Sequence, residues 1–247
     1  MNLSDINKRE IDFHNKLQSG KENRSEGIFY KALYNLFADF HKYLYENSQN
    51  KIVLDYGCGI GSLTEKVAKS HPEKIVGIDI SNISIDKAIA RAKEYNLNVE
   101  YKVDNCENSN LESNTFDLIY GSGILHHLNL EKSAKEINRL LKKNGKMLFI
   151  EPLGTNPIIN IYRKLTPKSR SEDEHPFLPG DFDFLKSVYA QVNVKYYGFF
   201  TLVFFPFYRK PEKSIIYNFF AAVDQKIFKI KIFKFLAWSV LIEAKKI

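Results

Sequence analysis

The sequence predicts an α/β fold in which helices cover both faces of a doubly wound, mostly parallel sheet. Three observations predict this class. A short apolar run ends in a glycine-rich turn that opens onto a helical pattern, and strand-like and helix-like segments then alternate along the chain. Hydrophobic residues make up 44% of the 247 residues, which is enough for a sizeable core. Strands that alternate with helices form parallel sheets, because each parallel crossover needs a long connection.

The predicted elements follow one another from residue 51 to residue 152. The expected strands are Lys51–Asp55, Lys74–Ile80, Val99–Val103, Phe116–Tyr120 and Lys146–Pro152. The expected helices are Ser62–Ser70, Ser84–Tyr95 and Leu130–Leu141. We expect Asn144-Gly145 to end the last of these helices, since glycine is the preferred residue just beyond a helix C-terminus.

The chain beyond residue 152 is predicted to cover and close this sheet. A polar stretch reaches Gly180, a helix is expected at Asp181–Tyr189, and apolar strand candidates lie at Val192–Phe205 and Ala237–Ala244. Between the two strand candidates, Ile215–Phe233 has a helical spacing of apolar residues with lysines interleaved. The apolar positions are Ile216, Phe219, Phe220, Val223, Ile227 and Phe228.

The charge of the chain is concentrated near its end. The formal net charge is +7, and residues 207–247 hold nine basic and three acidic residues. The remainder is nearly neutral, which argues against a nucleic-acid-binding domain. The basic helix at 215–235 could lie on an anionic membrane, pack on the sheet with its lysine stems covering apolar surface, or form a homodimer.

The cysteines and the first residues bear on the cell compartment. Cys58 and Cys106 match no zinc or disulfide pattern, so we expect neither a metal site nor a disulfide framework. The first residues are charged and lack the apolar segment of a secretion signal, and the longest apolar stretch, 196–207, is too short to span a membrane. These features predict a cytoplasmic protein.

The glycine-rich turn predicts a ligand site. Gly57, Gly59 and Gly61 follow the acidic end of the first strand, Asp55, and precede a helix. Glycines at alternate positions let the backbone approach a ligand, and a helix N-terminus presents free N–H groups. The spacing is one residue tighter than the GxGxxG of dinucleotide-binding folds, which argues against NAD and an oxidoreductase.

Five ordered motifs resemble those of class I S-adenosylmethionine-dependent methyltransferases. They are VLDYGCGIG (53–61), GIDIS (77–81), VDN (103–105), FDLIYGSGILHHL (116–128) and LLKKNGKMLFIEP (140–152). The resemblance implies a seven-stranded Rossmann-like fold whose last strand is antiparallel. It also implies three regions: an N-terminal helical lid (1–45), a cofactor-binding core (46–152), and a substrate lid with the basic helix and sheet-closing strands (153–247).

The same resemblance implies which residues bind S-adenosyl-L-methionine. Asp79 would accept both ribose hydroxyls, as an acid at this place does for nucleosides generally. Asp104 would meet the adenine amino group, although it and Asp79 could instead only cap helices. The remaining expected cofactor residues are Tyr30, Asp55, Gly57, Cys58, Gly59, Gly61, Ile80, Asn105, Cys106 and Gly121.

The candidate catalytic residues lie where ligands bind in such folds, at the carboxyl edge of the sheet. His126 and His127 follow the fourth strand, and either could receive a proton from an acceptor hydroxyl or simply pack beside the cofactor. Glu151, at the end of the fifth strand, could contact substrate or act as a cap. His175 lies in a charged loop that could form a lid.

The function expected from these features is methyl transfer to an oxygen, nitrogen or carbon atom of a small molecule, such as a lipophilic or hydroxylated metabolite or a glycolipid intermediate. The alternative is a catalytically silent cofactor-binding module that the basic helix anchors to a membrane or partner. An RNA or DNA methyltransferase is a further alternative, but the segment after the fourth strand lacks the proline-aromatic motif that holds a flipped base.

Overall fold

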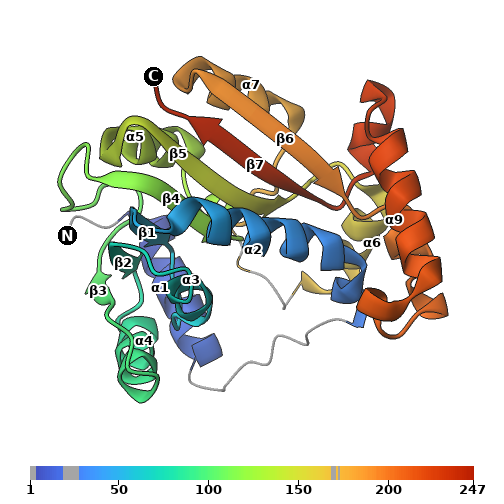
Figure 1. The fold of residues 1–247 in the computed structure, drawn as a ribbon. Helices are drawn as coiled ribbons and strands as arrows, with labels where there is room; N and C mark the ends of the chain where they lie inside the picture. The colour runs from blue at the N-terminus through green and yellow to red at the C-terminus, as the bar shows by residue number, and fades with distance from the viewer. Residues whose placement is uncertain (1–3, 19–27, 168–170, 172) are drawn as a thin grey trace.

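Seven strands form one sheet in the order β3-β2-β1-β4-β5-β7-β6 (Figure 1). The structure, a computed structural model, describes residues 4–18, 28–167, 171 and 173–247. The strands are β1 (Ile52–Tyr56), β2 (Lys74–Asp79), β3 (Glu100–Val103), β4 (Phe116–Ser122), β5 (Leu141–Pro152), β6 (Gln191–Tyr197) and β7 (Ser239–Lys245). Strands β1 to β5 pair in parallel, and β7 is antiparallel to β5 and β6. The predicted fold class, including the antiparallel last strand, is confirmed.

Helices cover both faces of the sheet. Those of the two covering layers are α2 (Tyr34–Ser48), α3 (Ser62–Ala68), α4 (Asn82–Glu94), α5 (Leu130–Leu140) and α7 (Pro179–Val188). On one face, Phe40 of α2 and Val67 of α3 share a hydrophobic cluster with the strands, and Arg91 of α4 donates to Glu65 of α3. On the other face, α5 and α7 pack against β5 and β7. The glycine-rich turn after β1 therefore lies at the edge of a sheet that is buried on both faces.

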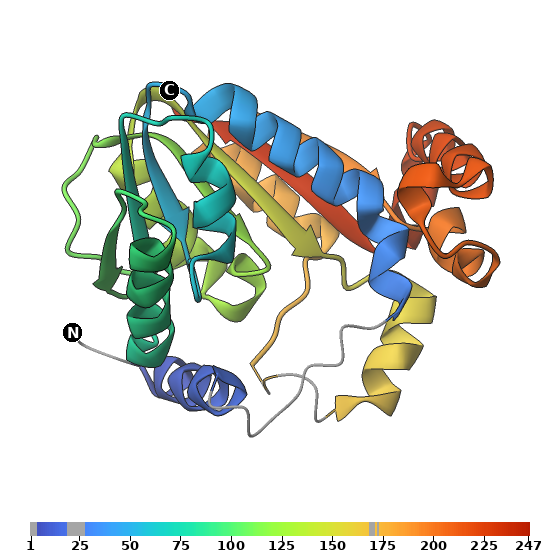
Figure 2. The same ribbon diagram turned by 60° about the horizontal axis from the view of Figure 1, so that its bottom comes forward.

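The remaining elements surround the carboxyl edge of the parallel strands. They are α1 (Asp5–Gln18), η1 (Ile28–Leu33), η2 (Leu125–His127), α6 (Pro157–Leu165), α8 (Phe200–Val203), η4 (Phe205–Phe207), η5 (Pro211–Lys213), α9 (Ile215–Ile227) and η6 (Lys231–Leu236). Figure 2 shows α1 and α6 on the same side of the molecule, with the segment that leads to α7 between them. The predicted region boundary at residue 45 falls inside α2, whose residues Leu36, Phe40 and Leu44 pack against the sheet. The division into three regions stays a prediction.

Two sequence predictions of element ends were wrong. The strand predicted at Val192–Phe205 ends at Tyr197, because Gly198 adopts a φ of +83° and the chain turns into α8. The helix before β5 ends at Leu140, four residues before Asn144. Asn144 itself has a φ of +63° and belongs to an irregular stretch within β5, where the pairing with β4 shifts register. Asn144-Gly145 is thus a turn in the strand and not a helix cap.

The basic helix is shorter than predicted, and its buried stripe is shifted from the predicted apolar positions, of which only Phe228 is fully buried. It ends at Ile227, and a separate turn, η6, follows it. Its buried residues are Tyr217, Ala221 and Asp224, whereas Phe219 is 61% exposed. The apolar spacing was misleading because Asp224 takes an inward position, where its carboxylate accepts hydrogen bonds from the first N–H groups of α8. Within the described residues, we find no helix that combines the length and the apolar character needed to cross a membrane.

Candidate active site

A cavity of about 560 Å³ lies at the carboxyl ends of β1, β2 and β4. It is lined by eight of the residues predicted to bind the cofactor. These are Asp55, Gly57, Cys58, Gly59, Asp79, Ile80, Asn105 and Cys106. Its volume is in the usual range for a small-molecule site. The structure therefore brings together most of the positions that the five motifs predicted.

The glycine turn forms one wall of this cavity. All three glycines have positive φ, a conformation that side chains rarely adopt. A Cβ on Gly57 would collide with Ile124, whereas a Cβ on Gly59 would meet nothing within 4 Å and would project into open space. The backbone at Gly59 thus leaves room for a ligand to approach closely. The residues fit a nucleoside cofactor at this turn.

Asp79 is fixed by the same turn. Its Oδ2 accepts a hydrogen bond from the Gly59 N–H at 2.9 Å, and its Oδ1 accepts one from the Ser81 N–H at 2.8 Å. A carboxylate has about four acceptor positions, so these two bonds orient the group while it lines the cavity. This position suits a carboxylate that accepts hydrogen bonds from a pair of ribose hydroxyls.

Asp55 lies at the inner end of the cavity. Burial, opposed by a hydrogen bond from the Thr64 hydroxyl at 2.6 Å, raises the pKa of Asp55 to about 7. Burial likewise raises the pKa of the Cys58 and Cys106 thiols well above its ordinary value, so both line the cavity as neutral groups. Two carboxyl groups in one cavity, those of Asp55 and Asp79, favour a cationic ligand group beside them.

Four predicted cofactor residues do not line the cavity: Asp104, Gly61 and Gly121, and Tyr30, which lies in a second cavity described below. The carboxylate of Asp104 accepts hydrogen bonds from the backbone N–H groups of Asn105 and Asn110. These bonds tie the carboxylate to the loop that follows β3. Gly61 and Gly121 lack a side chain for packing reasons, since a Cβ there would collide with Tyr101 and Phe149 respectively. In the described structure Asp104 is bonded to the backbone of the loop after β3, and the two glycines allow close packing.

The N-terminal segment was predicted to be a lid, but sequence reasoning did not single out the two residues of α1 that line the cavity. Asn7 and Glu10 of α1 line the cavity and are both at least 95% buried. Their spacing of three residues places them on one helix face. The helix is held over the site by bonds from Arg9 to both carboxylate oxygens of Asp173, each 2.8 Å long. In the sequence, the only indication of this role is that two polar residues lie three positions apart in a predicted helix. The neighbouring sequence does not show which part of the protein they contact.

A second cavity, of about 770 Å³, adjoins the first. Ser122 and Gly123 line both cavities, so the two meet where β4 ends. The walls of the second cavity are mainly apolar or aromatic: Phe29, Tyr30, Leu33, Tyr34, Leu36, Phe37, Ile150, Ile159, Tyr162 and Trp238. We call it the acceptor cavity. Tyr30, predicted to contact the cofactor, lines this cavity instead, and it packs beside Trp238 with ring centroids 5.1 Å apart.

His126 and Glu151 form a pair at the junction of the two cavities. His126 Nδ1 lies 2.6 Å from Glu151 Oε2, and both residues line the acceptor cavity. Oε1 of the same carboxylate accepts hydrogen bonds from the N–H groups of Ile124 and Leu125, at 3.1 and 2.9 Å. Glu151 thus caps the η2 turn, one of the two roles predicted for it, and also fixes the ring of His126.

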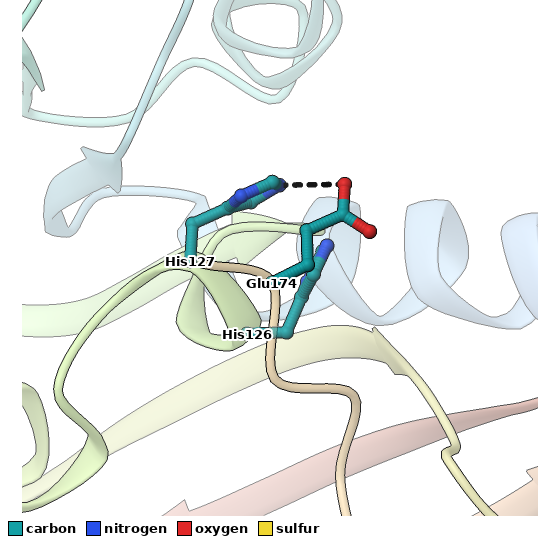
Figure 3. A group of neighbouring side chains, drawn as sticks. All are labelled: His126, His127 and Glu174. Carbon is teal, nitrogen blue, oxygen red and sulfur yellow. Dashed lines mark ion pairs between the residues drawn. The ribbon is translucent and has the colours of Figure 1, made fainter. Parts of the chain in front are cut away.

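His127 lies beside His126 but lines the first cavity, which we call the cofactor cavity because of the predicted cofactor residues in its wall. Its Nδ1 is 3.3 Å from Glu10 Oε2, and its Nε2 is 3.8 Å from Glu174 Oε1. Burial lowers the pKa of His127, which favours the neutral ring. Figure 3 shows the side chains of His126, His127 and Glu174 converging from η2 and the segment before α7, and one ligand atom from each lies within 4.8 Å of the others.

His175 is not part of the site. Its side chain is 60% exposed and lies 3.6 Å from Asp181, and it lines neither cavity. The neighbouring residue, Glu174, lines the acceptor cavity instead. Sequence reasoning chose the histidine of this loop for its titration range, whereas the geometry brings the carboxylate to the site.

Comparisons with known proteins agree with this geometry. Residues 53–145 match the family model described as a methyltransferase domain. A ubiquinone biosynthesis O-methyltransferase of Pelagibacter ubique is 32% identical over 165 residues, which are 61% of this chain and 67% of that protein. Phosphoethanolamine N-methyltransferase 1 of Triticum aestivum is 36% identical over 99 residues, or 39% of this chain and 20% of that protein.

A solved structure shows the same fold over the whole chain. It is geranyl diphosphate C-methyltransferase of Streptomyces coelicolor, in complex with Mg²⁺, geranyl diphosphate and S-adenosyl-L-homocysteine. It superimposes with a TM-score of 0.68 at 13% identity and covers 100% of both chains. These relatives offer no support for a silent binding module or a nucleic-acid enzyme. The protein is an enzyme whose cofactor is S-adenosyl-L-methionine, and it belongs to the class I S-adenosylmethionine-dependent methyltransferases.

Proposed function

We propose that this enzyme methylates a hydroxyl oxygen of a lipophilic small molecule bound in the acceptor cavity. The observation that carries the proposal is the cavity itself: its walls are largely aromatic, it adjoins the cofactor cavity at Ser122 and Gly123, and the His126–Glu151 pair lies there. The similarity to a relative named as an O-methyltransferase supports oxygen as the acceptor atom.

The residues of the chain have separate tasks in this reaction. The cofactor supplies a methyl group bonded to a sulfonium sulfur, and this sulfur is the leaving group when the acceptor attacks in line. Alignment of the acceptor with the methyl group in a dry site therefore provides most of the acceleration. Asp79 and the glycine turn hold the nucleoside, and Asp55 lies on the side that we assign to the cationic methionine part. The aromatic walls hold the acceptor and exclude water. The hydroxyl must also lose its proton, and the titratable side chains that converge at the junction of the two cavities are His126, His127 and Glu174.

The proposal is tested with a panel of lipophilic acceptors that carry a phenol, an alcohol or an amine, using mass spectrometry to locate the added methyl group. We expect turnover of hydroxyl compounds, a kcat loss in Glu151→Gln and His126→Gln, and a raised KM in Trp238→Ala. Products methylated on nitrogen or carbon would contradict the acceptor atom. Cofactor binding without turnover on any acceptor would favour the silent module.

We further propose that the C-terminal lobe, residues 200–236, lies on an anionic membrane surface. Apolar side chains are exposed on it, notably Phe207 (67%), Ile215 (86%) and Ile232 (70%). Lys226, Lys229 and Lys231 are exposed on the same lobe. Exposed apolar residues flanked by lysines are typical of interfacial binding. Pro211 of this lobe lines the acceptor cavity, so a lipophilic acceptor could pass to it from a bilayer.

Co-sedimentation with vesicles tests this surface. We expect binding to vesicles that contain phosphatidylserine, less binding to neutral vesicles, and a loss in both Phe207→Ser and the triple variant K226Q/K229Q/K231Q. K42Q/K69Q, which removes two exposed lysines from α2 and the turn after α3, is the matched control. Vesicle binding that the lobe variants leave intact would contradict the proposal, and a dimer lost in Phe207→Ser would favour the homodimer. The cytoplasmic location stays a prediction.

A further inference from the structure

We propose that His126, His127 and Glu174 form a binding site for one divalent transition-metal ion at the junction of the two cavities. The sequence contains no familiar metal-binding pattern, and we expected no metal from it. The three side chains come together only in the fold, because two consecutive residues of η2 face a residue 47 positions further along the chain.

The first observation is that both imidazole rings are held in a ligand-like way. Nδ1 of His126 is 2.6 Å from Glu151, and Nδ1 of His127 is 3.3 Å from Glu10. Histidines that bind metals usually have their other ring nitrogen bonded to a carboxylate or carbonyl, which fixes the ring and makes the ligand more basic. Here Nδ1 of His126 is bonded to the Glu151 carboxylate, and Nδ1 of His127 lies 3.3 Å from both the Glu10 carboxylate and the Ser171 hydroxyl, so we assign Nε2 of each ring as the ligand atom.

The second observation is the convergence of the ligand atoms. The ring centroids of His126 and His127 are 4.1 Å apart, and His127 Nε2 is 3.8 Å from Glu174 Oε1. One ligand atom from each of the three residues lies within 4.8 Å of the others. Metal–ligand distances of about 2.0–2.2 Å place the ligands of one tetrahedral ion roughly 3.4 Å apart, so a modest movement of Glu174 completes the set.

The third observation is the composition and location of the set. Two imidazoles and one carboxylate suit Zn²⁺, Co²⁺, Mn²⁺ or Fe²⁺ better than Mg²⁺ or Ca²⁺, which prefer oxygen ligands. His126 and Glu174 line the acceptor cavity, while His127 lines the cofactor cavity. Three protein ligands leave a coordination position open, and this position lies where an acceptor oxygen would meet the methyl group.

The role of the ion in catalysis rests on the proposed function, whereas its binding does not. A bound divalent ion lowers the pKa of a coordinated hydroxyl, so the acceptor could lose its proton to solvent at neutral pH. The oxygen then forms the new O–C bond as the S–C bond breaks, and the sulfur leaves as a neutral thioether. One proton is released for each methyl group transferred. The imidazoles are ligands in this scheme and do not receive the proton.

Metal binding to the untagged full-length chain tests the site without cofactor or acceptor. The protein is stripped with a chelator and titrated with Co²⁺, followed by visible absorption, and with Zn²⁺ in competition with a chromophoric chelator. We expect one ion per chain, with affinity at least about tenfold weaker in His127→Ala and Glu174→Gln. Glu10→Gln, which removes a charge behind the ligand His127, should keep the stoichiometry and weaken binding by about 10–100-fold.

His175→Ala is the matched control, because this exposed histidine neighbours Glu174 but lies outside both cavities. We expect it to bind Co²⁺ and Zn²⁺ like the wild type. Absence of stoichiometric binding by the wild type would overturn the proposal, as would equal binding by the wild type and Glu174→Gln. Glu174 is on the segment before α7 and outside the hydrophobic clusters, so its variant decides the matter even if His127→Ala fails to fold.

Discussion

Asp55 is a carboxyl group that the fold keeps away from water, and this has a consequence for stability. Its pKa is about 7 in the folded chain and near 3.8 when unfolded. Between these values the folded state holds a proton that the unfolded state has lost, so stability falls as pH rises from about 4 to about 7. The full shift corresponds to an upper bound of about 4 kcal/mol.

We expect Asp55→Asn to flatten this dependence. The amide cannot ionise, so the difference in unfolding free energy between pH 5 and pH 8 should shrink relative to the wild type. Urea unfolding at a series of pH values measures it, with Asp86→Asn, at an exposed position of α4, as the control. An unchanged slope in Asp55→Asn would show that Asp55 ionises normally in the folded chain.

Gly59 lines the cavity at a place where an added Cβ would meet no atom of the protein within 4 Å. We expect Gly59→Ala to weaken binding of S-adenosyl-L-homocysteine at least about tenfold, because its Cβ enters the cavity at a φ of +52°. Gly180→Ala is the control, since a Cβ there also meets nothing but the φ is not positive. Equal affinity of Gly59→Ala and the wild type, by calorimetry, would mean that the ligand does not approach this turn.

These residues also show what local sequence can predict. Asp55, Asp79 and the first two glycines of the turn, Gly57 and Gly59, could be predicted to line the cavity, because a turn after a parallel strand lies at the ligand-binding edge of the sheet. Tyr30 and Asp104 were misplaced, since which cavity a side chain lines depends on the packing of distant segments. His175 was favoured for its chemistry, but its side chain is 60% exposed and pairs with Asp181 outside the site.

At the scale of elements, the order and pairing of the strands follow from alternation, whereas their ends do not. The Phe-rich run after Tyr197 has the composition of a strand, yet Gly198 ends β6 and α8 begins. The buried stripe of α9 was shifted because a buried aspartate can be stabilised by capping another helix. Such contacts join elements that are distant in sequence, and periodicity does not report them.

The N-terminal helix α1 should serve the site more than the fold. None of its described residues belongs to a hydrophobic core cluster, yet Asn7 and Glu10 line the cofactor cavity. We expect a chain without residues 1–18 to unfold at nearly the wild-type temperature and to bind S-adenosyl-L-homocysteine at least about tenfold more weakly. A large drop in unfolding temperature, or unchanged affinity, would show that α1 has another role.

On the scale of the whole molecule, two cavities meet at the end of β4, one walled by the glycine turn and one by aromatic side chains. The first could be predicted from ordered motifs. The second could not, because its walls come from η1, α2, α6, β5 and the turn before β7, which have no shared sequence signal. The sequence therefore predicts the cofactor, whereas the residues that select the acceptor can be identified only in the folded structure.

Calorimetric titration of S-adenosyl-L-methionine and S-adenosyl-L-homocysteine, with NAD as a negative control, tests the central claim most directly. The account predicts saturable 1:1 binding of both methionine-derived ligands and none of NAD. Asp79→Ala should lose about 1–3 kcal/mol or more of binding free energy, because two ribose hydroxyls lose their acceptor, whereas Asp86→Ala should bind normally. Binding of NAD, or equal affinity of Asp79→Ala and the wild type, would contradict the assignment of this cavity to the cofactor.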